Sequence, residues 1–186
     1  IEKDDKERFQ TIYAKKPGAV AAPAAGLHFT KIILKKLELI GVKIVTITTH
    51  ISLGTFKDVD VEDLTKHKMD SENFSIPEKT SIVVNKALDQ GKKIVAVGTS
   101  TMKTLESSVS TSGKLKPNQG WTDKFIFPPF RFQICSGMVT NFHSPKSTLL
   151  MMAAAYGGFD NIMKAYKIAI QKKYRFHSYG DAMLIL

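Results

Sequence analysis

Cysteine is nearly absent from this sequence, since Cys135 is the only one among 186 residues. A single cysteine excludes an intrachain disulfide and a zinc site built from several cysteines, and it suits the reducing conditions of the cytosol. We expect Cys135 to be a small buried apolar residue rather than a nucleophile. The chain is therefore predicted to be cytoplasmic and to depend on its hydrophobic core for stability.

Long apolar runs are also missing, since none approaches the roughly 18 residues that a membrane-spanning helix needs. Acidic residues are fewer than basic ones, 17 against 27, which gives a formal net charge of +10. This excess indicates an anionic partner such as nucleic acid rather than a membrane span. A plain solvated surface is the alternative, because many lysines fall on predicted helix surfaces, as in "ILKKLE" and "QKKY".

The chain opens on Ile1 and the charged stretch "IEKDDKERFQ", which lacks the apolar segment of a signal peptide. Its length and its 43% content of hydrophobic residues fit one globular domain, or one domain and part of another. We therefore expect the chain to be part of a longer protein.

Helical and strand-like segments alternate along the chain. Apolar residues at helical spacing predict helices over residues 31–40, 61–66, 78–90, 99–110, 144–158 and 159–173. Runs rich in β-branched and aromatic residues predict strands over residues 42–50, 92–98, 124–135 and 137–142, with a last strand at the C-terminus. Loops are expected over 15–29 and 112–123, where breakers and turn residues gather. This alternation predicts an α/β fold with a mainly parallel sheet flanked by helices.

The junction "VAVGTSTMKTLES" predicts a strand that runs directly into a helix, with hydroxyls in the first turn. Such a helix start can present backbone N–H groups to an anion. It is neither a Walker A loop nor the G-x-G-x-x-G fingerprint of dinucleotide-binding proteins. Ser100 or Thr101 can equally be the helix N-cap, with or without a ligand.

The sequence has five histidines, and none forms H-E-x-x-H or a close pair, so no metal site is predicted. A single histidine is more often a structural hydrogen-bonding residue than a catalyst. His28, His50 and His143 stand out because each follows a strand-like or small-residue run and lies among polar groups. Ligands of open α/β sheets bind outside the carboxyl ends of the strands, where these histidines are expected.

The stretch "TNFHSPKST", residues 140–148, places polar groups between two apolar runs. Ser144 as N-cap and Pro145 at the first helical position would put Lys146, Ser147 and Thr148 in the first turn. A lysine opposes the helix dipole there, which indicates an anionic ligand, although an ordinary exposed lysine is the alternative.

The stretch "YRFHSYGDAMLI" gathers aromatic side chains around Arg175 near the C-terminus. Aromatic rings beside an arginine can stack on a nucleobase, or they can simply close the core.

Several stretches, spread over nearly the whole chain, share one resemblance: "FQTIYAKKPGAVAAPAAGLHFT", "THISLGTF", "HKMDSE", "IVAVGTSTMKTLES", "TDKFIFPPF", "VTNFHSPKSTLLM" and "YRFHSYGDAMLI". In this order they resemble the S-adenosylmethionine:tRNA ribosyltransferase-isomerases of queuosine biosynthesis. The α/β domain of that family carries an inserted β-barrel domain. Residues 1–186 would then be the C-terminal portion of the α/β catalytic domain, without the upstream strands and the barrel.

The resemblance implies an enzyme that moves the ribosyl part of S-adenosylmethionine onto 7-aminomethyl-7-deazaguanine at the tRNA wobble position. The product is epoxyqueuosine, and adenine and methionine are released. The expected partners are therefore tRNA bearing that base and S-adenosylmethionine as co-substrate, with no cofactor and no membrane. The sequence leaves the oligomeric state open, with a monomer expected.

On this resemblance, His28, His50 and His143 are the acid-base candidates. A base must remove a proton from C5′ of the ribose, beside the sulfonium, and an acid should assist the departure of adenine. Which histidine has which role is left open. The expected substrate contacts are Thr99, Ser100 and Thr101 for ribose or carboxylate, Lys103 next to them, Asn141 for orientation, Lys146, Ser147 and Thr148 for an anionic group, and Arg175, Tyr179 and Asp181 at the wall of the site.

Four positions depart from the family's usual pattern. Lys103 replaces an arginine, which keeps the charge but loses the planar fork of the guanidinium. Ser52 replaces a glycine, Asp70 a histidine and Ser144 a leucine. The change at Asp70 argues against an acid-base role for that position.

The alternative to the enzyme is a catalytically silent module that binds tRNA or a nucleotide, or an inactive fragment. The charge of +10 fits both alternatives. A protein that only binds would not need the polar groups of both "TNFHSPKST" and "GLHF", so the enzyme is favoured.

The basic composition leads to a first prediction, on binding to tRNA. If the lysines contact phosphates, raising the salt concentration from about 50 to about 200 mM should weaken tRNA binding by about 10³-fold or more, because condensed counterions are released on binding. Filter binding at several salt concentrations measures the slope. A flat response would assign the lysines to a solvated surface.

Overall fold

The computed structural model of the chain describes residues 8–177 and 179–186. Its α-helices are α2 (Lys31–Leu39), α3 (Glu78–Asp89), α4 (Thr99–Ser107), α5 (Thr148–Gly157) and α6 (Phe159–Gln171). Short 3-10 helices are η1 (Ala24–His28), η2 (Leu53–Phe56) and η3 (Leu64–Lys66). The strands are β1 (Thr48–His50), β2 (Glu72–Ile76), β3 (Val95–Val97), β4 (Asn118–Thr122), β5 (Gly137–Asn141) and β6 (Ala182–Ile185).

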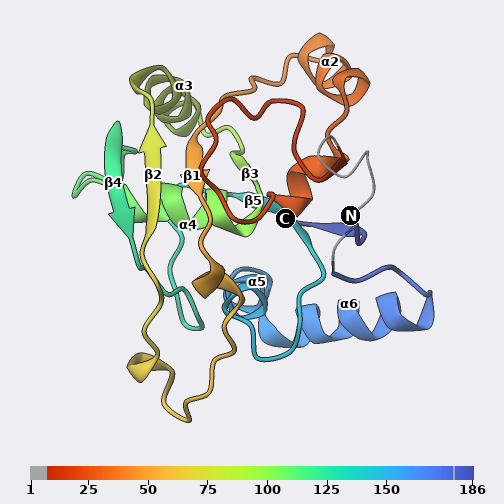
Figure 1. The fold of residues 1–186 in the computed structure, drawn as a ribbon. Helices are drawn as coiled ribbons and strands as arrows, with labels where there is room; N and C mark the ends of the chain where they lie inside the picture. Colours follow the sequence, from red (N-terminus) through yellow and green to blue (C-terminus); the bar gives the residue numbers. More distant parts are fainter. Residues whose placement is uncertain (1–7, 178) are drawn as a thin grey trace.

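The described strands form two small sheets rather than one mainly parallel sheet. In the first sheet, β2 lies between β1 and β4 and pairs with both in antiparallel orientation. In the second, β5 lies between a parallel β3 and an antiparallel β6. The fold is α/β as predicted, but the prediction of a mainly parallel sheet is wrong. Figure 1 shows β1, β2 and β4 side by side, with α3 above them and α5 and α6 below.

The wrong sheet prediction has identifiable local causes. β2 and β4 fall in segments with many turn residues, and β4 reads "NQGWT", which lacks the hydrophobic alternation of a predictable strand. β2 and β4 pair with each other, and this pairing between distant segments overrides the weak strand preference of each. The Asn73 side chain adds a hydrogen bond to the Gly120 carbonyl, 47 positions away. The strand predicted over 124–135 does not form, because Pro128 and Pro129 cannot donate to a ladder.

The predictions of the five longer helices are confirmed, because their signals are local, whereas the helix predicted over 61–66 is only the 3-10 helix η3. The α2 helix begins after Thr30, whose side-chain oxygen accepts a hydrogen bond from the backbone N–H of Ile33 at 3.2 Å. The chain then leaves the helix at Gly41, whose φ of 89° lies in the region that favours glycine. The helices α3, α4, α5 and α6 lie within their predicted ranges.

The α4 helix is the element shared by both sheets, since it contacts β1 of the first sheet, β3 and β5 of the second, and α5. Its polar residues are buried as well as its apolar ones. Lys103 forms a buried ion pair with Glu72 of β2. The same carboxylate accepts hydrogen bonds from the Thr55 hydroxyl and from the backbone N–H of Ser52. A buried ion pair thus ties α4 to the first sheet.

A carboxylate of α4 itself ties the helix to the segment before β5. Glu106 is 3% exposed and accepts hydrogen bonds from the backbone N–H groups of Gln133, Ile134 and Cys135 at 2.9 to 3.1 Å. Cys135 is buried, as predicted for an apolar role. Its burial, together with the charge of Glu106, raises the pKa of the thiol, so Cys135 carries no reactive thiolate near neutral pH.

One hydrophobic cluster joins both sheets and the helices α3, α4 and α5. Its members include Phe74 of β2, Met102 of α4, Met138 of β5 and Met152 of α5. A smaller cluster lies against α6 and is built around Phe142 and Ile162, Tyr166 and Ala169. Within the described residues, no helix combines the length and the apolar character that crossing a membrane requires.

The buried ion pair leads to a prediction on stability. Lys103→Met should destabilise the chain by about 3–5 kcal/mol, because it leaves the Glu72 carboxylate buried without its cation. Adding Glu72→Gln to that variant should recover part of the loss, since no charge then stays buried. Urea unfolding followed by circular dichroism measures both variants.

Lys35→Met is the matched control, because Lys35 pairs with Glu38 on the exposed surface of α2 and such pairs contribute little. An effect of Lys103→Met no larger than that of the control would contradict a structural role for the buried pair.

Candidate functional site

The carboxyl ends of β3 and β5 lie together, because these strands are parallel neighbours, and β6 begins at the same edge. Asn141, the last residue of β5, is paired with Ala182, the first of β6. The polar stretches "TNFHSPKST" and "YRFHSYGD" are therefore adjacent, as expected for a site at the strand ends. The 3-10 helix η1 also packs against β5 and brings His28 to this edge.

The centre of this edge is the carbonyl oxygen of Gly180. It accepts a hydrogen bond from His28 Nε2 at 3.1 Å and one from Asn141 Nδ2 at 3.1 Å. Asn141 Nδ2 also lies 3.3 Å from the carbonyl oxygen of Asp181. A carbonyl can only accept, so Nε2 of His28 carries a hydrogen. In the neutral ring the other nitrogen, Nδ1, then has the free lone pair.

A cleft of about 270 Å³ lies beside these groups, and we call it the histidine cleft. It is lined by Arg8, Ala24, Leu27, His28, Asn141, Arg175, Tyr179 and Gly180. The Arg8 guanidinium lies 5.2 Å from the centre of the Tyr179 ring, and Phe9 meets the same ring edge-on at 5.1 Å. The cleft thus combines an imidazole with two guanidinium groups and an aromatic wall.

Sequence reasoning missed Arg8 and Gly180. Nothing in the spacing of the charged opening distinguishes Arg8 from its neighbours, since its position depends on a contact with Tyr179 far along the chain. Gly180 had a signal, because glycine permits close backbone approach. A Cβ on Gly180 would lie 2.7 Å from the carbonyl oxygen of His177.

Arg175 and Asp181 hold the rim of the histidine cleft together. The Arg175 Nη2 atom lies 2.7 Å from Asp181 Oδ1, and the Arg175 backbone N–H donates to Oδ2 at 2.8 Å. These hydrogen bonds lower the pKa of Asp181 and raise the pKa of Arg175. The predicted site residues Arg175, Tyr179 and Asp181 therefore belong to one loop closed by its own ion pair.

His143 lies apart from the histidine cleft. Its Nε2 atom is 2.7 Å from the Thr140 hydroxyl, and its backbone N–H donates to the Tyr166 hydroxyl at 2.7 Å. Burial lowers the pKa of His143 to about 4, so the ring is neutral near neutral pH. A neutral imidazole can accept a proton but cannot serve as an imidazolium acid.

His50 lies at the end of β1, packed under Gly18. A Cβ on Gly18 would lie 2.5 Å from His50 Nδ1, so the ring requires glycine there. Within the described part of the chain, that buried Nδ1 atom has no hydrogen-bond partner. The structure places His28, His50 and His143 at different positions, and of the three, His28 lines the histidine cleft.

A second hollow, which we call the helix-start pocket, lies where α4 and α5 begin. Its volume is about 10 Å³, and its polar lining residues are Thr55, Thr99, Ser100, Lys103 and Thr148. It brings together predicted site residues that the histidine cleft does not contain. Thr99, Ser100, Lys103 and Thr148 thus line the helix-start pocket, and His28, Asn141, Arg175 and Tyr179 line the histidine cleft. The other predicted site residues, His50, Thr101, His143, Lys146, Ser147 and Asp181, line neither hollow.

The start of α5 differs from the prediction. Ser147, not Ser144, is the N-cap, and its hydroxyl accepts from the Leu150 backbone N–H at 3.1 Å. Lys146 therefore precedes the helix, where it is exposed and has a φ of 59°, and its carbonyl accepts from Val59. Ser147 has an extended backbone and forms an isolated antiparallel bridge with Asp58, so the helix begins after Ser147 and not at Pro145.

The start of α4 also differs, since its N-cap is Gly98, with a φ of 93° and no side-chain cap. Neither Ser100 nor Thr101 caps the helix. Thr99 and Ser100 face the helix-start pocket, whereas Thr101 is outside the lining of both hollows described here.

Three of the four departures from the family pattern, Lys103, Asp70 and Ser144, have side-chain partners, whereas the buried Ser52 hydroxyl has none among the described residues. Asp70 forms an exposed ion pair with Lys57 at 3.0 Å, so its carboxylate has a structural contact. The Ser144 hydroxyl lies 3.4 Å from His177 Nδ1. Within residues 8–177 and 179–186, no group of three or more histidine, cysteine, aspartate or glutamate residues is placed to hold a metal ion.

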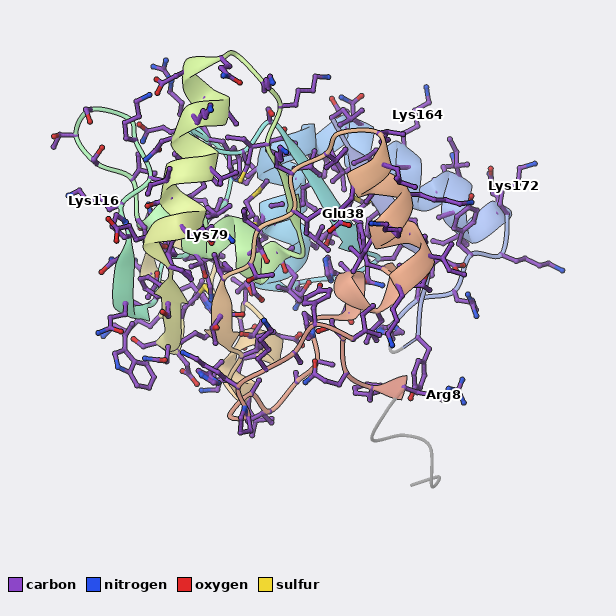
Figure 2. The ribbon with its side chains drawn as sticks, turned by 90° about the horizontal axis from the view of Figure 1, so that it is seen from above. Arg8, Glu38, Lys79, Lys116, Lys164 and Lys172 are labelled. Atoms are coloured by element: carbon purple, nitrogen blue, oxygen red, sulfur yellow. The ribbon has the colours of Figure 1, made fainter. Side chains whose placement is uncertain are left out.

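The basic charge is distributed over several elements. Figure 2 shows Lys79 on α3 and Lys116 before β4 on one side of the molecule, and Lys164 on α6 and Lys172 after α6 on the other side. These lysines do not form one patch in this view. The guanidinium groups of Arg8 and Arg175 are the positive groups that line the histidine cleft.

Comparisons with known proteins agree over the whole chain. The family model described as "Queuosine biosynthesis protein" matches residues 1–185. A curated relative from Cytophaga hutchinsonii, named S-adenosylmethionine:tRNA ribosyltransferase-isomerase, is 60% identical over 186 residues, covering 100% of this chain and 53% of its own length. A relative of the same name from Bacteroides fragilis is 55% identical with the same coverage. The chain spans about half the length of the curated relatives it matches.

A solved structure is also similar. The crystal structure of S-adenosylmethionine tRNA ribosyltransferase from Thermotoga maritima has a TM-score of 0.71 and 40% sequence identity, covering 88% of this chain and 52% of that one. The mixed α/β arrangement is therefore shared with a solved relative.

The low pKa of His143 leads to a prediction on pH dependence. An ordinary histidine in the unfolded chain gains a proton below about pH 6.5, whereas folded His143 gains one only near pH 4. Between these values the unfolded state binds more protons, so the free energy of unfolding should fall as the pH drops. The loss should reach about 3 kcal/mol near pH 4 and vanish above about pH 6.5.

Urea unfolding of the wild type and of His143→Gln at several pH values tests this. The glutamine keeps a polar side chain but does not titrate, so the variant should lose less stability than the wild type on acidification. Identical pH slopes for both chains would mean that His143 titrates normally.

Proposed function

The chain belongs to the queuosine biosynthesis protein family, and on that basis we propose that it forms the catalytic α/β part of a tRNA ribosyltransferase-isomerase. The reaction transfers the ribosyl part of S-adenosylmethionine onto 7-aminomethyl-7-deazaguanine at the tRNA wobble position. Epoxyqueuosine is the product, and adenine and methionine leave. Because the relatives are about twice as long as the matched region, the complete reaction is proposed for the full-length protein.

The histidine cleft is the observation that carries the proposal. Its volume of about 270 Å³ suits part of a nucleoside, close to the lower end of ligand sites. It lies at the carboxyl end of β5, where the Gly180 carbonyl orients His28. A fixed imidazole beside a cleft is the arrangement that proton transfer to or from a bound substrate requires.

Within this proposal His28 is the acid-base residue. Its Nε2 hydrogen is engaged by the Gly180 carbonyl, so Nδ1 is the atom that accepts a proton from C5′ of the ribose. The sulfonium next to that carbon makes the proton acidic. His143 stays neutral because of its lowered pKa, and His50 is packed under Gly18, so both are proposed as supports of the site.

Asn141 positions the loop that carries this carbonyl. Its amide donates to the carbonyl oxygens of Gly180 and Asp181, which holds the two residues before β6 against the end of β5. Asn141 is 5% exposed, so these bonds form away from competing water. Its role is to keep the acceptor of His28 in place.

The rim of the histidine cleft suits the nucleic acid substrate. Arg8 lies over the Tyr179 ring, and Arg175 extends from the same rim while paired with Asp181. Guanidinium groups bind phosphates, and aromatic rings stack on splayed bases. The target base would therefore enter beside Tyr179, with its phosphates near the arginines. No feature of the described residues favours the catalytically silent alternative.

The test is adenine release by a chimera in which this chain replaces the matching half of its 60% identical relative. His28→Gln should lower the rate by about 100-fold or more, because glutamine can donate to Gly180 but cannot accept the proton. Affinity for S-adenosylmethionine, measured by calorimetry, should change little.

His177→Asn is the matched control, since His177 is exposed and its φ of 63° is tolerated by asparagine. It should release adenine at the wild-type rate. Wild-type turnover by His28→Gln would remove His28 from the reaction, and a chimera that neither binds S-adenosylmethionine nor releases adenine would overturn the proposed function.

A further inference from the structure

The helix-start pocket is formed by two helix N-termini. Thr99 and Ser100 open α4, and Thr148 and Leu149 open α5, and all four line it. The first-turn N–H groups of a helix and its dipole favour negative charge. Both helices are long enough for this effect, with 9 and 10 residues. Two helix N-termini at one pocket therefore favour an anionic group there.

The charged side chains nearby do not cancel this potential. Lys103 lines the pocket, and its ion pair with Glu72 makes the two together neutral. No acidic side chain is among the described residues that line it. The other walls are apolar, with Ile126 and Met152 among them, so the helix termini act in a medium that screens them weakly.

Thr148 supplies an independent sign of a ligand. It is 3% exposed, and its Oγ1 atom has no hydrogen-bond partner within the described residues. Buried hydroxyls are nearly always paired, because an unpaired one costs free energy in the folded state. Of the described residues that have an unpaired buried side-chain atom, Thr148 is the one that lines this pocket, so its hydroxyl is the group that a ligand there would complete.

The size of the pocket limits which chemical group can bind to the Thr148 hydroxyl. A volume of about 10 Å³ holds about one oxygen-sized group. A carboxylate can place one oxygen there while the rest of the molecule stays outside. A phosphate is less suited, since its tetrahedral shape brings further oxygens against the apolar walls.

We propose that the helix-start pocket binds the α-carboxylate of the methionine part of S-adenosylmethionine, between the N-termini of α4 and α5 and the Thr148 hydroxyl. This inference rests on the proposed function and deepens it. The histidine cleft then takes the nucleoside and tRNA side of the reaction, while the carboxylate anchors the co-substrate at α4. The binding energy comes from backbone N–H groups, which a substitution of an exposed lysine such as Lys146 leaves intact.

The test compares S-adenosylmethionine with decarboxylated S-adenosylmethionine, which keeps the sulfonium and the amine but lacks the carboxylate. Calorimetry on the chimera should show at least tenfold tighter binding of the carboxylate-bearing ligand. In Thr148→Val, which removes the hydroxyl at nearly constant volume, this ratio should fall several-fold. Thr148→Ser keeps a hydroxyl and should retain the wild-type ratio.

Thermal unfolding without ligand distinguishes a binding role from a structural one. If the hydroxyl serves a ligand, Thr148→Val should melt at the same temperature as the wild type or higher, because an unpaired polar group is removed. A clear drop in melting temperature together with an unchanged binding ratio would overturn the inference.

The outcomes also separate the two proposals. Equal binding of both ligands by the wild type would overturn the carboxylate site and leave the proposed function standing. Binding of neither ligand would overturn both, because the chimera would then lack a site for S-adenosylmethionine.

Discussion

The buried ion pair between Lys103 and Glu72 is the constraint on which the arrangement of the molecule depends. It joins the helix that follows β3 to the middle strand of the other sheet. Because both side chains are buried, moving Lys103 away from Glu72 would leave an unpaired charge in the core. The pair therefore holds α4 between two sheets that share no ladder among the described strands. Glu106, three residues later in the same helix, adds hydrogen bonds from the backbone N–H groups of the segment before β5.

The position of α4 in turn determines where ligands can bind. β3 and β5 are parallel, so the N-termini of the helices that follow them, α4 and α5, lie at the same end of the second sheet. The two helices contact each other. The antiparallel β6 returns to the same edge and brings the Gly180 carbonyl to His28 and Asn141. Two hollows result, a larger one with an imidazole and guanidinium groups and a smaller one between helix N-termini.

Prediction from the sequence succeeded where the signal is local. The Thr30 cap and the apolar spacing after it predict α2, and the stretch ending in Asn141 predicts β5. It failed for β2 and β4, whose ladder depends on pairing between distant segments, and for the cap of α5. Ser144, Pro145 and Ser147 are all plausible helix starts, and the choice of Ser147 depends on the bridge to Asp58.

The sequence by itself determined the family, the helices and the residue types that carry the chemistry, because caps, periodicity and motifs are properties of neighbouring residues. It identified His28, Asn141 and Thr148 as candidates near the strand ends, but it did not give the contacts that each of them makes. Only the tertiary structure decided that His28 shares a carbonyl with Asn141, since the bond joins His28 to Gly180, 152 positions away. Only the tertiary structure placed the Thr148 hydroxyl in a pocket wall with no partner among the described residues, because burial and pairing depend on how distant elements pack.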